Sequence, residues 1–388
     1  MSKTNPIEFR DYQKEAIYQA IKDKRITLIS PTGSGKSLII YSIIRYLLQT
    51  KLKKILLVVP TINLTSQMFS DFSEYSTENK WDTEKHCHCI TAGIDKNSKK
   101  EVFISTWQSI FDLPKEYFKD FEAVIIDECH LSKAESLRKI LDRCTNATYR
   151  IGTSGTLDGT KCHKMIIEGG LGPVLQVSTT KNLMDQGHLA KLKVTIVVLN
   201  YPKEECKAVK ALDYHEEMQW IVAHKKRNEF ITKLSLKFNK NALYLFNYVE
   251  KHGIPLFKMI DKALPKERKR FFISGATEGE DRENARKITE QEKDAVIVAS
   301  YGTFSTGINI PSLQFLTFTS PSKSQIRILQ SIGRTLRNTK EKPIANIIDI
   351  VDNLKYKSYE NYALKHFKER FKIYTNEQFE YEIIKINL

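Results

Sequence analysis

Residues 26–48 read ITLISPTGSGKSLIIYSIIRYLL. The apolar, β-branched run at residues 26–29 predicts a strand, and the apolar pattern of residues 38–48 predicts a helix. The glycines between them let backbone N–H groups crowd around phosphate oxygens, and the start of a helix adds a favourable dipole. We therefore interpret residues 30–37 as a phosphate-binding loop, with Ser30 standing where the general pattern has its first glycine.

This loop would hold a nucleotide through consecutive residues: Pro31, Thr32, Gly33, Ser34, Gly35, Lys36 and Ser37. Lys36 is expected to reach the β- and γ-phosphates, and Ser37 is expected to ligate Mg²⁺. The alternative is a chance glycine-rich turn, which would need neither a strand before it nor a helix after it.

Upstream, the segment Phe9–Gln13 opens a predicted helix. A glutamine amide can pair with the adenine edge through two hydrogen bonds, as it does in base readout. We therefore expect Gln13, together with Phe9 and Arg10, to form a second group of residues that bind the nucleotide. An ordinary amphipathic helix start explains the same segment.

A second acidic motif follows a buried strand, in the sequence VIIDECH at residues 124–130. Open α/β sheets bind ligands at the carboxyl ends of their strands. We expect Asp127 to hold Mg²⁺ and Glu128 to position and polarise the attacking water. A solvated acidic strand end is the alternative for the Asp-Glu pair taken alone.

Composition places limits on the class of protein. The chain has 388 residues, more than one hydrophobic core of ~250–300 residues usually serves, so we expect two domains. The excess of 61 Lys and Arg over 46 Asp and Glu favours a polyanionic partner such as nucleic acid over a merely basic soluble enzyme. The N-terminus lacks a signal-like apolar core and the apolar runs have strand length, so we expect no membrane partner and a cytoplasmic location, in the host cytoplasm if the source is viral.

Cysteine and histidine gather at His86-Cys87-His88-Cys89. Both residue types bind zinc, but structural zinc pairs are normally separated by two to four residues. Alternate residues of a strand share a face, so we expect Cys87 and Cys89 to point together into a core. The cysteines of this chain are interpreted as reduced thiols.

Short apolar runs alternate with helical patterns along the whole chain, which is typical of parallel sheets covered on both faces. The predicted fold class is α/β. The runs are residues 26–29, 55–59, 102–104, 124–126, 194–199, 295–299, 315–318 and 347–350. We place a first domain at residues 1–187, a second at 188–354 and a short helical C-terminal tail at 355–388.

Five segments resemble the motifs of the superfamily-two helicases, in the order that the family has them. They are residues 32–37, 127–130, 154–156, 303–311 and 330–337, which resemble motifs one, two, three, five and six. The resemblance implies two tandem RecA-like lobes with an ATP cleft between them. It also implies a motor that hydrolyses ATP with Mg²⁺ as it moves along nucleic acid.

The last motif would add positive charge at the transferred phosphoryl group. Arg334 and Arg337 lie three residues apart on a predicted helix and so share one side. The resemblance implies that they are arginine fingers from the second lobe, a contact associated with ~10³–10⁵ in rate. Gln330 shares that side and would orient water or the γ-phosphate. Two ordinary surface charges are the alternative.

The same resemblance points to contacts with a nucleic-acid strand through hydroxyl, amide and backbone groups, which hold phosphates without reading sequence. The residues are Pro60, Thr61, Gln67, Thr106, Gln108, Asn247, Thr303, Ser305 and Thr306. Each one taken singly is also compatible with a plain surface or turn position.

Other positions of the family pattern concern the nucleotide and its link to the strand. Gly307 and Asn309 match positions near the nucleotide, where many relatives carry Asp in place of Asn309. His130, Ser154 and Thr156 are expected to link the ATP site to the strand-binding face. Two aromatic residues, Trp107 and Tyr301, could stack on bases. For Trp107, core packing is the favoured reading.

Segments beyond the motifs, including residues 59–61, 105–108, 127–131, 298–302 and 304–307, are similar to the bacteriophage UvsW-type DNA helicases. The likeness implies an ATP-dependent DNA motor on forks, junctions and displaced-strand loops in recombination and repair. Members of that type carry a further small N-terminal domain, and this sequence begins almost directly at the first motif. We expect a minimal translocase, use of the 355–388 tail, or a single-strand-binding or recombination protein as partner.

Two other functions stay open at this point. The chain could act on RNA or RNA–DNA hybrids, because motors that track the backbone need a 2′-OH contact to tell the strands apart. It could also be an ATP-controlled nucleic-acid clamp or an accessory subunit that binds without unwinding, which the complete set of catalytic motifs disfavours.

Overall fold

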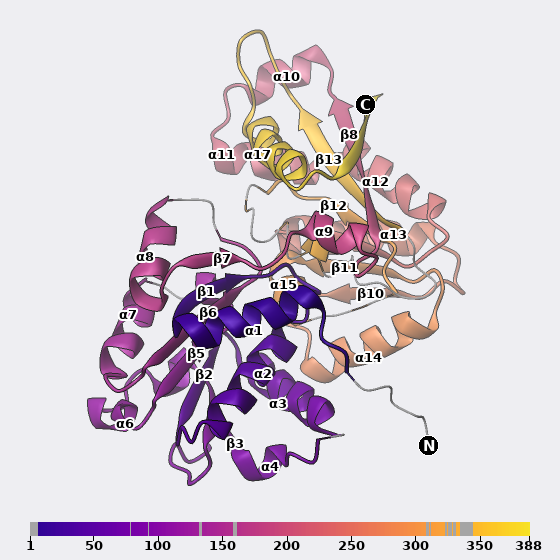
Figure 1. Cartoon of the computed structure of the whole chain (residues 1–388). Coiled ribbons are helices and arrows are strands. Elements are labelled where there is room, and N and C mark those ends of the chain that lie inside the picture. The colour runs from indigo at the N-terminus through magenta and orange to yellow at the C-terminus, as the bar shows by residue number, and fades with distance from the viewer. Residues whose placement is uncertain are drawn as a thin grey trace. The chain divides into compact units, whose positions relative to one another are not determined.

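A computed structural model describes residues 7–388 apart from 78, 92, 132–133, 158–160, 308–309, 311, 323, 325–327, 329–330 and 334–343. The chain divides between Thr179 and Thr180 into two compact units. In Figure 1 the first unit runs from indigo to magenta and the second from rose to yellow. The sequence places this boundary near residue 188, so α9 (Thr180–Asp185) is grouped with the second unit here.

A parallel sheet of seven strands forms the centre of the first unit. In spatial order its strands are β3 (Cys87–Ile90), β4 (Val102–Thr106), β2 (Ile55–Val59), β5 (Ala123–Ile126), β6 (Tyr149–Ser154), β1 (Arg25–Ile29) and β7 (Val174–Gln176). The predicted strands at 26–29, 55–59, 102–104 and 124–126 are confirmed.

Helices cover both faces of this sheet (Figure 1). They are α1 (Asp11–Asp23), α2 (Lys36–Gln49), α3 (Ile62–Ser76), α4 (Thr83–His86), α5 (Trp107–Ile110), α6 (Lys115–Lys119), α7 (Ala134–Arg143) and α8 (Lys161–Leu171). The strand β2 shows why its sequence is apolar throughout. Ile55, Leu57 and Val59 face one core cluster, whereas Leu56 and Val58 face the other.

The second unit also has a parallel seven-stranded sheet. Its spatial order is β10 (Arg270–Ile273), β11 (Val296–Ser300), β9 (Ala242–Phe246), β12 (Phe315–Phe318), β13 (Ile344–Asn353), β8 (Lys191–Asn200) and β14 (Glu380–Asn387). Its helices include α10 (Lys203–Val209), α11 (Tyr214–Ala223), α12 (Lys225–Lys237), α13 (Ile254–Ala263), α14 (Gly279–Gln291), α15 (Tyr301–Gly307) and α17 (Tyr362–Asn376). The predicted α/β class with two tandem parallel-sheet domains is confirmed.

The C-terminal tail differs from the helical extension expected at residues 355–388. Helix α17 is present, but β14 follows it and pairs in parallel with β8. Glutamate and lysine alternate there with Ile383, Ile384 and Ile386, so charges obscure the strand pattern. The β-branched residues favour a strand once β8 offers an open edge.

The cysteines of β3 test one further expectation from the sequence. Cys87 lies in the core cluster under α2 and α3, and Cys89 packs against the same cluster, which confirms that the two side chains point into a core. Across the part of the chain that the structure describes, no helix is long and apolar enough to cross a membrane.

A pair of glycines at the end of α8 tests the packing of the first sheet. Gly172 has a φ of +106°, and a Cβ there would collide with the backbone of Arg25 at the start of β1. We expect Gly172→Ala to lower the free energy of unfolding by about 1–3 kcal/mol. Gly169 lies in α8 with no neighbour near its Cβ position, so Gly169→Ala should stabilise by up to ~1 kcal/mol. Urea denaturation followed by circular dichroism measures both, and a stable Gly172→Ala variant would contradict this account.

Candidate active site

The candidate residues of the first unit gather at the carboxyl edge of its sheet. β6 lies between β1 and β5, and the three strands are parallel. The phosphate-binding loop follows β1, the acidic pair Asp127 and Glu128 follows β5, and Ser154 ends β6. Neighbouring parallel strands thus deliver all three groups to one place, as the sequence motifs predict.

Two left-handed glycines shape the phosphate-binding loop. Gly33 has a φ of +85° and Gly35 a φ of +82°, a conformation that glycine adopts without steric cost. The Ser30 hydroxyl donates to the Ser34 hydroxyl at 2.6 Å. Ser30 therefore ties the two ends of the loop together at the position where the general pattern has a glycine.

Lys36 forms an ion pair with Glu128. Its ammonium lies 3.1 Å from Glu128 Oε1, and the two side chains are only 13% and 17% exposed. Glu128 has a φ of +46°, a left-handed conformation that is uncommon for a residue other than glycine. Gly155 lies beside the pair, where an added Cβ would stand 3.2 Å from Lys36 Nζ.

The pKa values of the two carboxyl groups of the acidic motif are shifted in opposite directions. Burial, together with the neighbouring Glu128, raises the pKa of Asp127 to about 6. Burial alone would raise the pKa of Glu128 too, but the charge of Lys36 and the hydrogen bond from His130 outweigh the effect of burial and lower that pKa. Glu128 is therefore ionised at neutral pH, as a group that polarises water must be.

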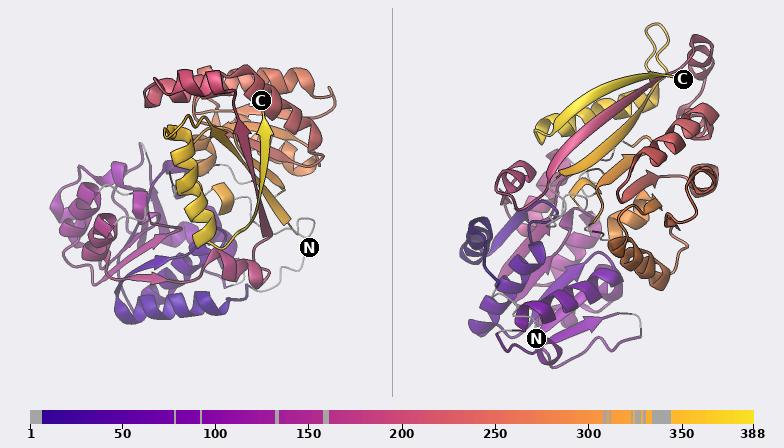
Figure 2. Two further views of the ribbon diagram at one scale, coloured as in Figure 1. Left: turned by 90° about the horizontal axis from the view of Figure 1, so that it is seen from above. Right: turned by 90° about the vertical axis from the view of Figure 1, so that its right-hand side faces the viewer.

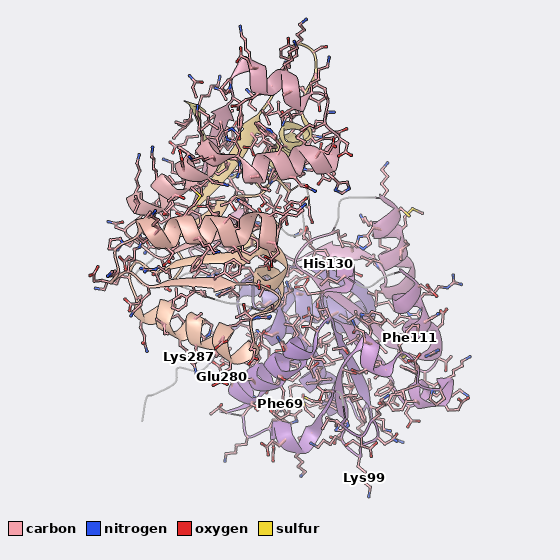
Figure 3. All side chains as sticks on the ribbon, turned by 180° about the vertical axis from the view of Figure 1, so that it is seen from behind. Phe69, Lys99, Phe111, His130, Glu280 and Lys287 are labelled. Atoms are coloured by element: carbon pink, nitrogen blue, oxygen red, sulfur yellow. The ribbon has the colours of Figure 1, made fainter. Side chains whose placement is uncertain are left out.

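His130 connects Glu128 to the end of β6, and it is labelled among the side chains of the first unit in Figure 3. Its Nδ1 lies 2.7 Å from Ser154 Oγ and 3.2 Å from Glu128 Oε2. The Ser154 hydroxyl donates its proton to Thr156 O at 2.7 Å, so the His130 Nδ1 is the donor toward Ser154. The expected linking residues, His130, Ser154 and Thr156, thus form one continuous chain of hydrogen bonds that starts at Glu128.

Gln13 holds the phosphate-binding loop from outside. Its Nε2 donates to Ser34 O at 2.8 Å, and its Oε1 accepts from the Arg10 backbone N–H at 3.0 Å. The Tyr12 hydroxyl donates to the same Ser34 carbonyl at 2.8 Å, a contact that the sequence analysis did not identify. Adenine recognition by Gln13, Arg10 and the 37%-exposed Phe9 stays a prediction.

Oxygen donors for a cation are present beside the loop. The Asp127 carboxylate accepts a 2.7 Å hydrogen bond from the Thr153 hydroxyl, and the Ser37 hydroxyl lies 2.8 Å from the Tyr75 hydroxyl. A carboxylate and a serine hydroxyl are both oxygen ligands, which a hard divalent cation such as Mg²⁺ takes, so Asp127 and Ser37 fit such a cation by their chemistry.

The expected strand contacts of the first unit follow β2 and β4, at the same carboxyl edge. Thr61 caps α3 and Thr106 caps α5 through their side-chain oxygens. Pro60 and Thr61 are half-buried, and the amides of Gln67 and Gln108 are exposed. Thr106 is only 3% exposed, so its hydroxyl serves the cap, where it lies 2.9 Å from Ser109 Oγ.

The second unit places Asn247 and Thr303 at the carboxyl edge of its own sheet. Asn247 follows β9 and donates from its backbone N–H to Ser320 Oγ at 3.1 Å. Thr303, near the start of α15, lies 2.7 Å from Ser300 through its hydroxyl. Ser305, Thr306 and Gly307 lie in α15, but their side chains lie outside the described part of the structure, as do Asn309, Gln330, Arg334 and Arg337 altogether.

The two aromatic stacking candidates both pack against other protein side chains, Tyr301 buried and Trp107 half-buried. Tyr301 is 1% exposed and its ring stacks on the Phe318 ring with 6.0 Å between centroids, so the expectation that it could stack on a base is wrong. Trp107 packs against a core cluster of the first unit, 5.9 Å from the Phe111 ring, which confirms the core reading.

The raised pKa of Asp127 gives a testable pH dependence. Its folded pKa of about 6 lies above the ordinary value near 4, so ionised Asp127 destabilises the fold above pH 6 and this cost disappears as the pH falls toward 4. Asn at this position still accepts from Thr153 but cannot ionise. We expect urea denaturation without Mg²⁺ to give Asp127→Asn a higher free energy of unfolding than the wild type at pH 8. The difference between the two free energies should be smaller at pH 5. The exposed Asp112→Asn is the control, and an equal gain at both pH values would refute the assignment.

The chain is similar to known helicases and restriction-enzyme subunits. A family model described as Type III restriction enzyme, res subunit, matches residues 6–159, and one described as Helicase conserved C-terminal domain matches residues 225–339. The ATP-dependent DNA helicase uvsW of Enterobacteria phage T4 is 35% identical, with 98% of this chain and 78% of that protein covered. The DNA 3'-5' translocase XPB2 of Sulfurisphaera tokodaii is 23% identical, with 89% of this chain and 82% of that protein covered.

A solved structure shows the same fold at low identity. The ATP-dependent Type ISP restriction-modification enzyme LlaBIII bound to DNA has a TM-score of 0.70 at 17% identity, over 99% of this chain and 32% of that one. The phage T4 relative decides the family, because its identity and coverage are both high. This chain therefore belongs to the UvsW-type ATP-dependent DNA helicases of superfamily two and is a nucleic-acid-dependent ATPase.

Proposed function

We propose that this helicase remodels branched DNA, such as forks, junctions and displaced-strand loops, in recombination and repair. The likeness to the UvsW-type helicases supports the substrate. The observation that carries the motor function is the chain of contacts from Lys36 through Glu128 and His130 to Ser154. Through these contacts, a movement of Lys36 toward a bound phosphate can alter the position of Ser154, at another point on the carboxyl edge of the first sheet.

Hydrolysis would begin with an exchange of partners at Lys36. The ammonium leaves Glu128 for the β- and γ-phosphates, and the released Glu128 carboxylate holds and polarises the attacking water. Because its pKa is lowered, Glu128 is ready to accept a hydrogen bond from that water at neutral pH. Ser37 and Asp127 would hold Mg²⁺, which neutralises phosphate charge when it is bound.

Coupling to DNA would use the neighbouring strands of the first sheet. Residues after β2 and β4, including Thr61 and Gln108, lie on the same carboxyl edge as the acidic pair after β5. A shift of Glu128 toward water changes its contact with His130 and, through Ser154, the path of residues 154–156. Phosphate contacts should make DNA binding salt-dependent. The logarithm of the binding constant should fall with the logarithm of the salt concentration, with a slope of about −0.7 to −0.9 per neutralised phosphate.

The second unit would supply the remaining positive charge. Arg334 and Arg337 are proposed to stabilise the charge that develops on the transferred phosphoryl group, with Gln330 orienting water or the γ-phosphate. The family resemblance of residues 330–337 supports this assignment. Gly307 and Asn309 would then contact the nucleotide from the same unit.

Two substitutions test the hydrolytic site. Lys36→Ala removes the phosphate contact and Glu128→Gln removes the group that polarises water, so both should reduce DNA-stimulated ATPase activity to background in a phosphate-release assay. Circular dichroism should show both variants folded. Lys54→Ala, which removes an exposed ion pair with Asp120 at 2.8 Å, is the matched control and should keep full activity. Persistent turnover in Lys36→Ala or Glu128→Gln would refute the site.

The substrate is tested by ATPase rates without nucleic acid and with duplex DNA, single-stranded DNA, single-stranded RNA and a synthetic four-way junction. We expect the junction to stimulate most and Arg334→Ala to lose that stimulation. Stimulation by RNA alone would favour an RNA helicase. Tight ATP-dependent binding without strand separation would favour a clamp, and equal rates with every strand would place specificity in a partner protein.

A further inference from the structure

Two arginines are among the most deeply buried side chains of the second unit, and each pairs with an aspartate of β13. Arg227 in α12 donates to Asp352 from Nε at 2.7 Å and from Nη2 at 3.1 Å. Arg370 in α17 donates to Asp349 from Nε and from Nη2, both at 2.8 Å. Each of these four residues is at most 2% exposed, so the pairs are screened from water.

These pairs lie on opposite faces of the second sheet. Asp349 and Asp352 are three residues apart on one strand, and only alternate residues of a strand share a face. Figure 2 shows α17 against one face of the sheet and α12 with α13 against the other. A tyrosine completes each pair: Tyr201 donates to Asp352 at 2.7 Å, and Tyr374 donates to Asp349 at 2.8 Å.

Each guanidinium also donates a hydrogen bond to a backbone carbonyl, and both carbonyls belong to the same short segment. Arg227 Nη2 donates to Thr319 O at 2.8 Å, and Arg370 Nη1 donates to Ser322 O at 2.8 Å. Residues 319–322 follow β12 directly, and we call them the exit segment. Charge pairs from the two faces of the sheet thus hold the two ends of the exit segment.

Other groups hold the middle of the exit segment. Asn247 donates from its backbone N–H to Ser320 Oγ at 3.1 Å and from Nδ2 to Pro321 O at 3.3 Å. His252 Nδ1 lies 3.0 Å from Ser320 Oγ. Burial, with the charge of Arg227, lowers the pKa of His252 to about 3, so this ring is neutral at physiological pH.

Stability alone does not require such pairs. Taking two charges out of water is costly, and replacing a buried ion pair with apolar residues of similar volume is often neutral or stabilising. The pairs instead fix geometry. One rigid guanidinium fork donates to a carboxylate and to a backbone carbonyl at fixed angles, so it holds the carbonyl in a set orientation relative to β13. The exit segment precedes residues 330–337, which carry the proposed arginine fingers, in the sequence.

We propose that Arg227 and Arg370 are positioning residues for ATP hydrolysis, which fix the start of the chain segment that carries Arg334 and Arg337. The inference rests on the function proposed for those two arginines. It gives the C-terminal extension a part in the motor, because Arg370 lies in α17. A weakened carbonyl contact should therefore lower kcat before it changes the affinity for ATP or DNA.

Arg370→Lys tests the inference. A lysine ammonium can pair with Asp349 but lacks the fork that also reaches Ser322 O. Tyr374→Phe is the matched control, because it removes a hydrogen bond to the same buried carboxylate and leaves the carbonyl contact in place. The measurements are DNA-stimulated kcat, KM for ATP, Kd for DNA and the melting temperature.

We expect Arg370→Lys to lose on the order of 10- to 100-fold in kcat, with KM and Kd within about twofold of the wild type. Tyr374→Phe should keep kcat within about twofold even where its melting temperature falls. Arg227→Lys and Tyr201→Phe form a second matched pair on the opposite face, which keeps the inference testable if Arg370→Lys folds poorly.

Equal kcat losses in the lysine and phenylalanine variants, or losses that follow the melting temperature, would overturn the inference. Arg334→Ala separates this inference from the proposed function. If Arg334→Ala hydrolyses ATP normally, the function proposed for Arg334 fails. If Arg334→Ala loses kcat while Arg370→Lys keeps it, only the positioning role of Arg370 fails.

Discussion

The ion pair between Lys36 and Glu128 is the contact around which the first unit's site is built. It forms because β1 and β5 lie on either side of β6, so the residues after them meet at one edge of the sheet. Glu128 takes a left-handed backbone conformation, and Gly155 leaves room for the lysine. His130 contacts the other carboxylate oxygen of Glu128. A phosphate that draws Lys36 away changes each of these contacts.

The sequence predicts the parts of this arrangement that depend on local pattern. Apolar β-branched runs identify β1, β2, β4 and β5, and glycines between strand and helix identify the loop, because both signals lie within a few neighbouring residues. The order of strands then brings Lys36 and Glu128 together at the carboxyl edge. Sequence does not reveal that Tyr12 supports the loop, because a tyrosine at a helix start carries no mark of its partner.

Long-range contacts explain most of what the sequence misses. Arg227 and Asp352 lie 125 residues apart, and two charged residues in separate helical and strand patterns give no sign that they pair. Tyr301 shows the same difficulty, since an aromatic residue in a helicase motif fits a base or a core equally well until the fold buries it. The sequence does not predict the strand β14, because its partner β8 is distant in sequence and because the charged residues of β14 resemble the polar face of a helix.

Affinity for a slowly hydrolysed ATP analogue, measured by titration calorimetry for the wild type and Glu128→Gln, tests the central role of the ion pair. Neutralising Glu128 frees the Lys36 ammonium for phosphate, so the account predicts tighter analogue binding in Glu128→Gln than in the wild type. Equal or weaker binding would show that ATP does not compete with Glu128 for Lys36, and the account of this site would then be wrong.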